Sequence, residues 1–297
     1  MLEEIFRRPL LLFAVSLVVL SMATWAGVAL LTRLRAQVVD MRDDVRTVAG
    51  ATLTLLALLI GFSFSMAVSR YDQRKNLEEG EANAIGTEYV RADLLPAADA
   101  ARVRALLAKY LDVRIRFYVA SDIEELKAID AQTAQLQGSL WSAAQVPASA
   151  RPDPVVALAV AGMNDVLNSQ GYTQAAWLNR IPLAAWILMT VIAICATLLA
   201  GFGATSAKAL PRVLLMLPLM LSFAFYLIAD IDAPRRGLIA VKPQNLLLLS
   251  NSLRETPAKS TPTTQRPMSS TWSRYSPYPS ASISSRGMKR SDAELMQ

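Results

Sequence analysis

The residues of this chain that could act on an ion are spaced along one uncharged stretch, residues 47–69, and just beyond it. Thr54, Leu58 and Phe62 recur every four residues, so on a helix they form one stripe. In a ring of identical subunits this stripe would line an axial constriction, and apolar constrictions gate ion paths by dewetting. Arg70 follows on roughly the same face, so a ring would place positive charges beside the constriction and favour anions.

Both assignments have ordinary alternatives. A stripe of this kind also occurs where a helix packs against lipid or against another helix, and spacing alone does not separate these cases. Arg70 can instead pair with Asp72 or Glu78, or extend its charged end to the lipid headgroups. Under these alternatives the residues would have no direct effect on an ion.

A second group of charged residues lies at the end of the last apolar stretch and comprises Asp230, Asp232, Arg235 and Arg236. We expect structural ion pairs among these residues at the membrane surface, each worth under about 1 kcal/mol. Two carboxylates alone make a weak cation site, so we expect no metal there.

Nothing else in the chain has the residue types that catalysis needs. Glu78, Glu79 and Glu81 follow Arg74 and Lys75, which is typical of a solvated helix face with i,i+4 ion pairs. The sequence has no histidine and one cysteine, which excludes histidine-based catalytic pairs, Cys/His zinc sites and an internal disulfide. Since no base or nucleophile has a suitably spaced partner, we expect no enzyme activity, no catalytic residue, no metal and no cofactor.

The elements that would position these residues are stretches long enough to cross a membrane. Hydrophobic residues make up 53% of the 297 residues and charged residues 18%, with a mean hydropathy of +0.32. A bilayer core needs about 20 apolar residues in a helix. We predict four transmembrane helices, at residues 9–32, 47–69, 181–207 and 211–230.

The four crossings place both termini and the polar segment 70–180 on one side of the membrane. Lys and Arg near the membrane ends number nine on that side and six on the other, and these residues resist translocation. We therefore predict a multi-pass protein of an inner or plasma membrane, with cytoplasmic residues 1–8 and a cytoplasmic domain at 70–180. Residues 231–250 would form a juxtamembrane segment, and the Ser/Thr/Pro-rich residues 251–297 a disordered cytoplasmic tail. Because this tail carries most of the net charge of +6, the charge does not indicate nucleic-acid binding.

The segment 70–180 is predicted to be helical throughout, because its apolar residues recur at helical spacing and no strand pattern alternates. The second membrane helix meets no proline before Pro96, so we expect one nearly continuous helix from Val48 to about Leu95. Further helix boundaries follow from local motifs. These are a capping box of Ser121 with Glu124, a linker bounded by Pro147 and Pro152, and an N-cap at Asp153 with Pro154 in the first turn.

The second membrane helix also resembles a known family. Gly61-Phe62, followed seven residues later by Ser69-Arg70-Tyr71, resembles the second-helix signature of bestrophins. The chain is more similar still to a bacterial bestrophin-like domain family of uncharacterised membrane proteins, over roughly residues 5–250. The segments that carry this similarity are 70–74, 81–87, 91–96 and 230–239.

The resemblance implies four-helix subunits that assemble as a homopentamer, with the second helices around an axial pore for anions such as chloride. By position, Thr54, Leu58 and Phe62 would then line the pore. The implied partners are the lipid bilayer, further copies of the chain and an inorganic ion. The expected fold is thus an all-α integral membrane protein with a cytoplasmic helical domain between two helix pairs. The alternative is a non-conducting, membrane-anchored interaction or sensory protein that acts through this helical domain.

Overall fold

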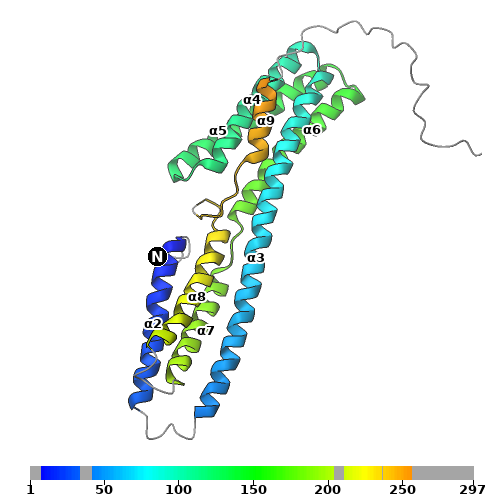
Figure 1. Ribbon diagram of the computed structural model, residues 1–297. Helices are drawn as coiled ribbons and strands as arrows, with labels where there is room; N and C mark the ends of the chain where they lie inside the picture. Colours follow the sequence, from blue (N-terminus) through cyan, green and yellow to red (C-terminus); the bar gives the residue numbers. More distant parts are fainter. Residues whose placement is uncertain (1–7, 34–41, 204–210, 236, 256–297) are drawn as a thin grey trace, which may run out of the picture. The chain divides into compact units, whose positions relative to one another are not determined.

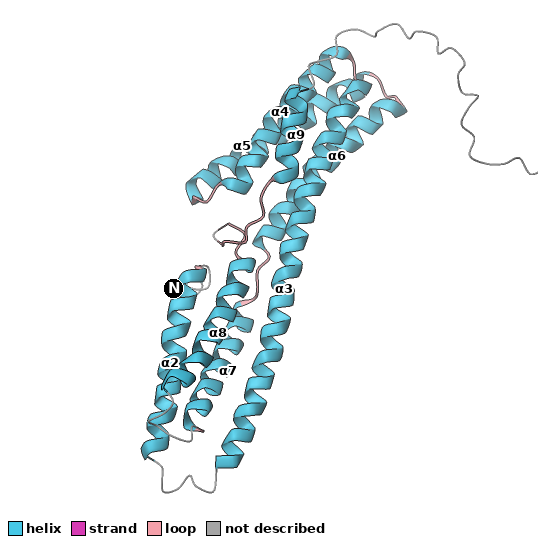
Figure 2. Cartoon of the chain, in the orientation of Figure 1, coloured by secondary structure: helices cyan, strands magenta, loops and turns pink. Residues whose placement is uncertain are grey.

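The chain is built from helices, as the sequence predicts. A computed structural model describes residues 8–33, 42–203, 211–235 and 237–255, and within these ranges the secondary structure is helical with no strand (Figure 2). The apolar stretches and the polar segment between them form two separate hydrophobic cores. The all-α fold class is therefore confirmed.

Among the described residues, four helices are long and apolar enough to cross a membrane. They are α2 (Pro9–Arg33), the first part of α3 (Arg42–Arg91), α7 (Leu183–Phe202) and α8 (Pro211–Asp232). Both α2 and α3 pack against α7 and α8 (Figure 1). Only 22% of the apolar window of α2 and 17% of that of α3 are buried within the chain. The remaining apolar surface needs an apolar surrounding, so the chain is a multi-pass membrane protein.

Helices α2 and α7 approach each other closely because a glycine of each faces the backbone of the other. A Cβ atom on Gly27 would collide with the carbonyl oxygen of Leu198, and one on Gly201 with the carbonyl oxygen of Thr24. Small residues at such crossings let the backbones of membrane helices come into contact. The two glycines therefore fix where α2 lies on α7.

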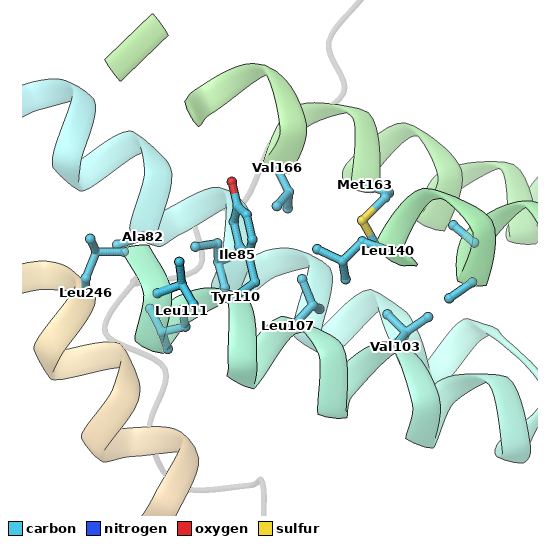
Figure 3. Packing of buried hydrophobic residues seen from close by; sticks show 14 of the residues in the cluster. Ala82, Ile85, Val103, Leu107, Tyr110, Leu111, Leu140, Met163, Val166 and Leu246 are labelled. Atoms are coloured by element: carbon cyan, nitrogen blue, oxygen red, sulfur yellow. The ribbon is translucent and has the colours of Figure 1, made fainter. Parts of the chain in front are cut away.

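The second core belongs to the helical domain of the polar segment. It is formed by the second part of α3, the short 3₁₀ helix η1 (Ala92–Leu94), α4 (Ala97–Val119), α5 (Ile123–Ala150), α6 (Pro154–Leu178) and α9 (Gln244–Glu255). Figure 3 shows the packing: Ile85 of α3 lies beside Leu107 and Tyr110 of α4, with Met163 and Val166 of α6 across from them. Since α9 contributes the fully buried Leu246, the chain after the last membrane helix returns to this domain.

The predicted continuous second helix is confirmed. Helix α3 has 50 residues, and η1 ends it just before Pro96. It belongs to both cores, because Leu56 and Ala67 pack in the first and Ala82 and Ile85 in the second. A single helix therefore connects the membrane part to the helical domain.

Two predicted helix boundaries are wrong and one is confirmed. Pro147 lies inside α5 and not in a linker. Proline has no N–H group and so leaves one backbone hydrogen bond of the helix unmade, and burial of the Pro147 ring offsets this loss. The Pro147 carbonyl still accepts a hydrogen bond from Arg151 N–H (3.0 Å), so the helix continues past the proline. The N-cap of α5 is Asp122 and not Ser121, because its carboxylate accepts the N–H groups of Glu124 and Glu125. The cap of α6 at Asp153 with Pro154 after it is as predicted.

The segment after the last membrane helix differs from the expected division at residue 251. Helix α9 runs through that position to Glu255. The rest of the predicted tail, residues 256–297, lies outside the described residues.

Candidate functional site

The stripe of Thr54, Leu58 and Phe62 lies on a face of α3 that is open in the single chain. Phe62 is 63% exposed and Leu58 53%, and Thr54 is exposed as well. The Thr54 hydroxyl donates to the carbonyl of Gly50 (2.9 Å), so its polar group is satisfied inside the helix. The stripe is therefore available either to lipid or to another subunit.

The opposite face of α3 is packed inside the chain. Leu56 and Ala67 are buried in the membrane core. The Ser63 hydroxyl donates to the sulfur of Met189 on α7 (3.2 Å). This packing fixes the rotation of α3 about its axis, so it also fixes the direction in which the stripe points.

Beyond Phe62 the open side of α3 becomes polar. A shallow groove follows the helix there and is lined by Ser65, Val68, Ser69, Asp72, Gln73, Asn76 and Leu77. Apolar side chains at Leu58 and Phe62 are thus followed by hydroxyl, amide and carboxylate groups. The amide and carboxylate groups lie beyond residue 69, where α3 leaves the predicted membrane segment, so this part of the open side borders water.

Arg70 takes part in an ion pair that the sequence did not indicate. Its guanidinium lies 3.4 Å from the carboxylate of Asp232 at the end of α8, and the two side chains are 14% and 8% exposed. The second oxygen of Asp232 accepts the N–H of Ile181 (3.1 Å). Arg70 therefore connects α3 to the end of α8, and Asp232 offsets part of its charge. The side chain is directed to the packed side of α3, so the expectation that it shares the open face of Phe62 was wrong.

Arg74, one turn after Arg70, is buried against the end of α6. It donates to the carbonyl of Ala176 (3.2 Å) and to that of Asn179 (2.9 Å). Burial lowers the pKa of Arg74, since its charged form has lost water. These bonds satisfy the last carbonyls of α6, which is the usual role of a basic side chain at a helix end.

The other charged residues at the end of α8 have partners that differ from our expectation of mutual ion pairs. Asp230 accepts the N–H groups of Leu238 (2.8 Å) and Ile239 (2.9 Å), which folds the chain back on the helix end. Arg235 donates to the carbonyls of Phe117 (2.5 Å) on α4 and of Ala120 (3.0 Å), the residue that follows this helix. The helix end is buried against neighbouring elements, so backbone groups replace the expected partners. Arg236 lies outside the described residues.

Aromatic rings surround the guanidinium of Arg235. It lies 4.4 Å from the ring centroid of Phe117 and 4.3 Å from that of Trp177, both within the range of cation–π contacts. Burial lowers the pKa of Arg235 to about 10. The contacts of Arg235 with Phe117 and Trp177 hold the segment after α8 against the ends of α4 and α6.

Two of the three glutamates that we expected on a solvated face are buried. Glu78 accepts the N–H of Leu246 (2.9 Å) and the side-chain amide of Asn245 (2.7 Å), so it caps the N-terminus of α9. Glu81 pairs with Arg114 of α4, and both side chains are fully buried. Only Glu79 is exposed, and the expectation was wrong for the other two.

Glu81 also organises the polar groups around it. It accepts hydrogen bonds from the hydroxyls of Tyr118 (3.2 Å) and Thr173 (3.3 Å). Burial raises the pKa of Tyr118, and the nearby Glu81 carboxylate raises it further. The sequence did contain a signal for this burial, because Glu78, Glu81 and Ile85 share one face of a helix.

The described part of the chain contains no cluster of three or more acidic, Cys or His side chains that could hold a metal ion. The arrangement on α3 instead consists of an open apolar stripe, a polar groove and an arginine paired beside them. Together with four membrane-spanning helices, these features define a multi-pass helical membrane protein whose second helix carries the candidate site.

The comparison with known families agrees with this class. Residues 14–246 match the bestrophin-like domain, so the chain belongs to the bestrophin-like domain family. The predicted resemblance is confirmed. No curated protein matches the chain.

Solved structures show the same fold. A mutant form of a bacterial bestrophin homolog from Klebsiella pneumoniae has a TM-score of 0.61 and 14% identity, covering 82% of this chain and 98% of that one. Another structure of the homolog has a TM-score of 0.57 and 15% identity, covering 80% and 98%. At these identities the likeness establishes the fold alone.

Proposed function

We propose that this chain forms a homo-oligomeric channel for inorganic anions such as chloride, lined by α3. The observation that carries the proposal is the open side of α3, where the stripe of Leu58 and Phe62 continues into a polar groove. Membership of the bestrophin-like family supports the proposal. A ring of subunits, five by resemblance to bestrophins, would enclose this side and leave the packed face toward α7 and α8.

In such a ring Phe62 would form the main constriction. It is the most exposed large apolar side chain of α3 between Thr54 and Ser69. Conduction through an apolar constriction depends on both its radius and its lining, because a narrow apolar passage excludes water. The polar groove on the far side of Phe62 would then hold the hydrated ion.

The constriction is tested by replacing Phe62 with alanine and recording currents from purified protein in planar bilayers. We expect Phe62→Ala to conduct more and to close less, since a wider and less apolar passage stays wet. Phe64→Ala is the matched control, because Phe64 is also exposed but lies two residues on, off the stripe. Equal currents from both variants would show that Phe62 does not form the constriction. No current from the wild type would contradict the channel itself and favour the anchored interaction protein.

Anion preference would depend on Arg70 and on how far Asp232 offsets its charge. Since the pair separation is 3.4 Å, we expect the net field of the pair to be weak and the preference modest. Replacing Asp232 with asparagine should raise the anion-to-cation permeability ratio. Arg70→Gln should lower the ratio, and Arg70→Glu should lower it further. Reversal potentials in asymmetric salt measure it, and an unchanged ratio in assembled variants would remove Arg70 from the ion path.

A further inference from the structure

Helix α3 carries a third buried glutamate, Glu88, whose surroundings differ from those of Glu78 and Glu81. Its side chain is fully buried, and neither carboxylate oxygen has a hydrogen-bond partner among the described residues. Glu78 and Glu81, on the same helix, each accept at least two hydrogen bonds. A buried carboxylate without donors is costly when charged, so this position needs a separate explanation.

Glu88 lies directly against the backbone of α6. A Cβ atom on Gly162 would collide with an oxygen of the Glu88 carboxylate, and the guanidinium of Arg91 borders the same point. Glycine at this position therefore lets the carboxyl group fit between α3 and α6. The next α6 core residues, Met163 and Val166, are fully buried. The carboxyl group thus sits within one of the main packing contacts of the helical domain, that of α3 with α6.

Few charged groups act on this carboxyl. Arg91 comes from the same helix, and Asp165 from α6. Arg104 of α4 donates to the carbonyl of Tyr89 and to the carboxylate of Asp93 in η1, and not to Glu88. Arg91 favours the charged form of Glu88, whereas Asp165 opposes it.

The balance favours the protonated form. Burial is the largest cause and raises the pKa of Glu88 to about 8, with Asp165 adding to the rise and Arg91 opposing it. A carboxyl group that is released into water titrates near its ordinary pKa of about 4.3. The pKa of Glu88 is higher in the packed state than in water. The free energy that its protonated form contributes to packing is therefore present at low pH and decreases as the pH rises toward the pKa of the buried carboxyl group.

We propose that Glu88 is a proton-binding site that controls the contact between α3 and α6. With its proton bound, the neutral carboxyl group lies against Gly162 and the contact is closed. Loss of the proton places a charge between the helices that has no hydrogen-bond donor and that Arg91 offsets only in part, and α6 separates from α3 so that water reaches the carboxylate. No reaction is involved beyond the transfer of one proton between this carboxyl group and solvent. The proposal does not require that the chain conducts ions.

Hydrogen exchange of the purified full-length protein tests the proposal. Protection factors, corrected for intrinsic exchange, are measured for α6 (Pro154–Leu178) at about pH 5.5, 6.5 and 7.5. In the wild type we expect protection of α6 to fall by up to about tenfold per pH unit, because opening releases one proton. In Glu88→Gln, which stays neutral, protection of α6 should be independent of pH. Glu79→Gln, at an exposed position on the same helix, should behave as the wild type.

Two outcomes would overturn the proposal. One is an equal pH dependence of α6 protection in Glu88→Gln and in the wild type. The other is read from the wild type alone, and therefore holds even if the variant fails to fold. Helix α5 (Ile123–Ala150) serves as the internal reference, since it packs mainly against α4 and not against α3. An α6 slope no steeper than that of α5 would show that no proton is bound at the contact with α3.

Discussion

At the scale of single residues, the helical domain depends on charges that are buried and paired. Arg114 and Glu81 are both fully buried, and the guanidinium also stacks on the ring of Phe117, 4.3 Å from its centroid. Such a pair adds little net stability over apolar residues of the same shape, because both charges have lost water. Removing one partner has a much larger effect, since the other charge is left uncompensated.

We therefore predict that Arg114→Met lowers the free energy of unfolding by about 3–5 kcal/mol. Glu81 would remain buried with only hydroxyl donors. The control is Lys127→Met, which breaks the exposed pair with Glu124 and should change stability by under about 1 kcal/mol. Denaturant titration in detergent, followed by tryptophan fluorescence, measures both. Similar values for the two variants would show that the buried pair is not needed.

At the scale of helices, the position of one helix on another is determined where a small residue or a capping side chain contacts the backbone of the neighbouring helix. The crossing of α2 with α7 depends on Gly27 and Gly201. The N-terminus of α9 depends on the carboxylate of Glu78 from α3. In both cases a residue of one helix fixes the place of another.

The crossing predicts the effect of one added methyl group. Gly201→Ala should destabilise the protein by about 1–3 kcal/mol, because its Cβ would overlap the carbonyl oxygen of Thr24 and force α2 outward. Gly80→Ala is the matched control, since nothing lies within 4 Å of the added atom. It should stabilise α3 by up to about 1 kcal/mol, as alanine has the higher helix propensity. Thermal unfolding in detergent compares them, and opposite signs are expected.

The cap of α9 makes a separate prediction. In Glu78→Ala the first turn of α9 loses a charged acceptor, so we expect a cost of about 1–3 kcal/mol, confined mainly to this helix. Hydrogen exchange should therefore speed up in α9 (Gln244–Glu255) and stay unchanged in α5. Glu79→Ala, at the exposed neighbouring position, should leave α9 protected. Equal exchange in both variants would mean that packing of Leu246 alone holds α9.

At the scale of the whole molecule, orientation in the membrane and assembly into a ring can each be tested directly. We expect reporter fusions after Lys75 and after Asn251 to indicate the cytoplasm, because basic residues near the membrane are more numerous on that side. A reporter on the far side in either fusion would contradict this orientation. The mass of the detergent-extracted complex should be a multiple of the 32.3 kDa chain, five by resemblance to bestrophins. A monomeric mass would argue against a ring around α3.

The sequence predicted the helices well and their contacts poorly. The membrane helices are determined by long uncharged stretches, and the continuity of α3 is determined by the absence of proline before Pro96. Both features can therefore be recognised within a single segment of the sequence. The partners of Arg70 and Glu78 lie 162 and 167 residues away along the chain, at the end of α8 and in the first turn of α9. No local pattern indicates such a pairing. Burial of Glu78 and Glu81 was missed because glutamates near Arg74 and Lys75 ordinarily face solvent.

Because α3 runs unbroken for 50 residues, the exposed membrane stripe and the buried glutamates keep a fixed angle to each other about the helix axis. Each residue of an α-helix turns the chain by about 100°. One residue inserted after Ser69 would turn Glu78, Glu81 and Glu88 away from α9, α4 and α6 while Phe62 stayed in place. An insertion of seven residues would restore the phase to within about 20° but would displace the domain by about 10 Å. The spacing between Phe62 and Glu78 therefore cannot change without disrupting one of the two parts. This stretch should tolerate substitutions far better than insertions or deletions.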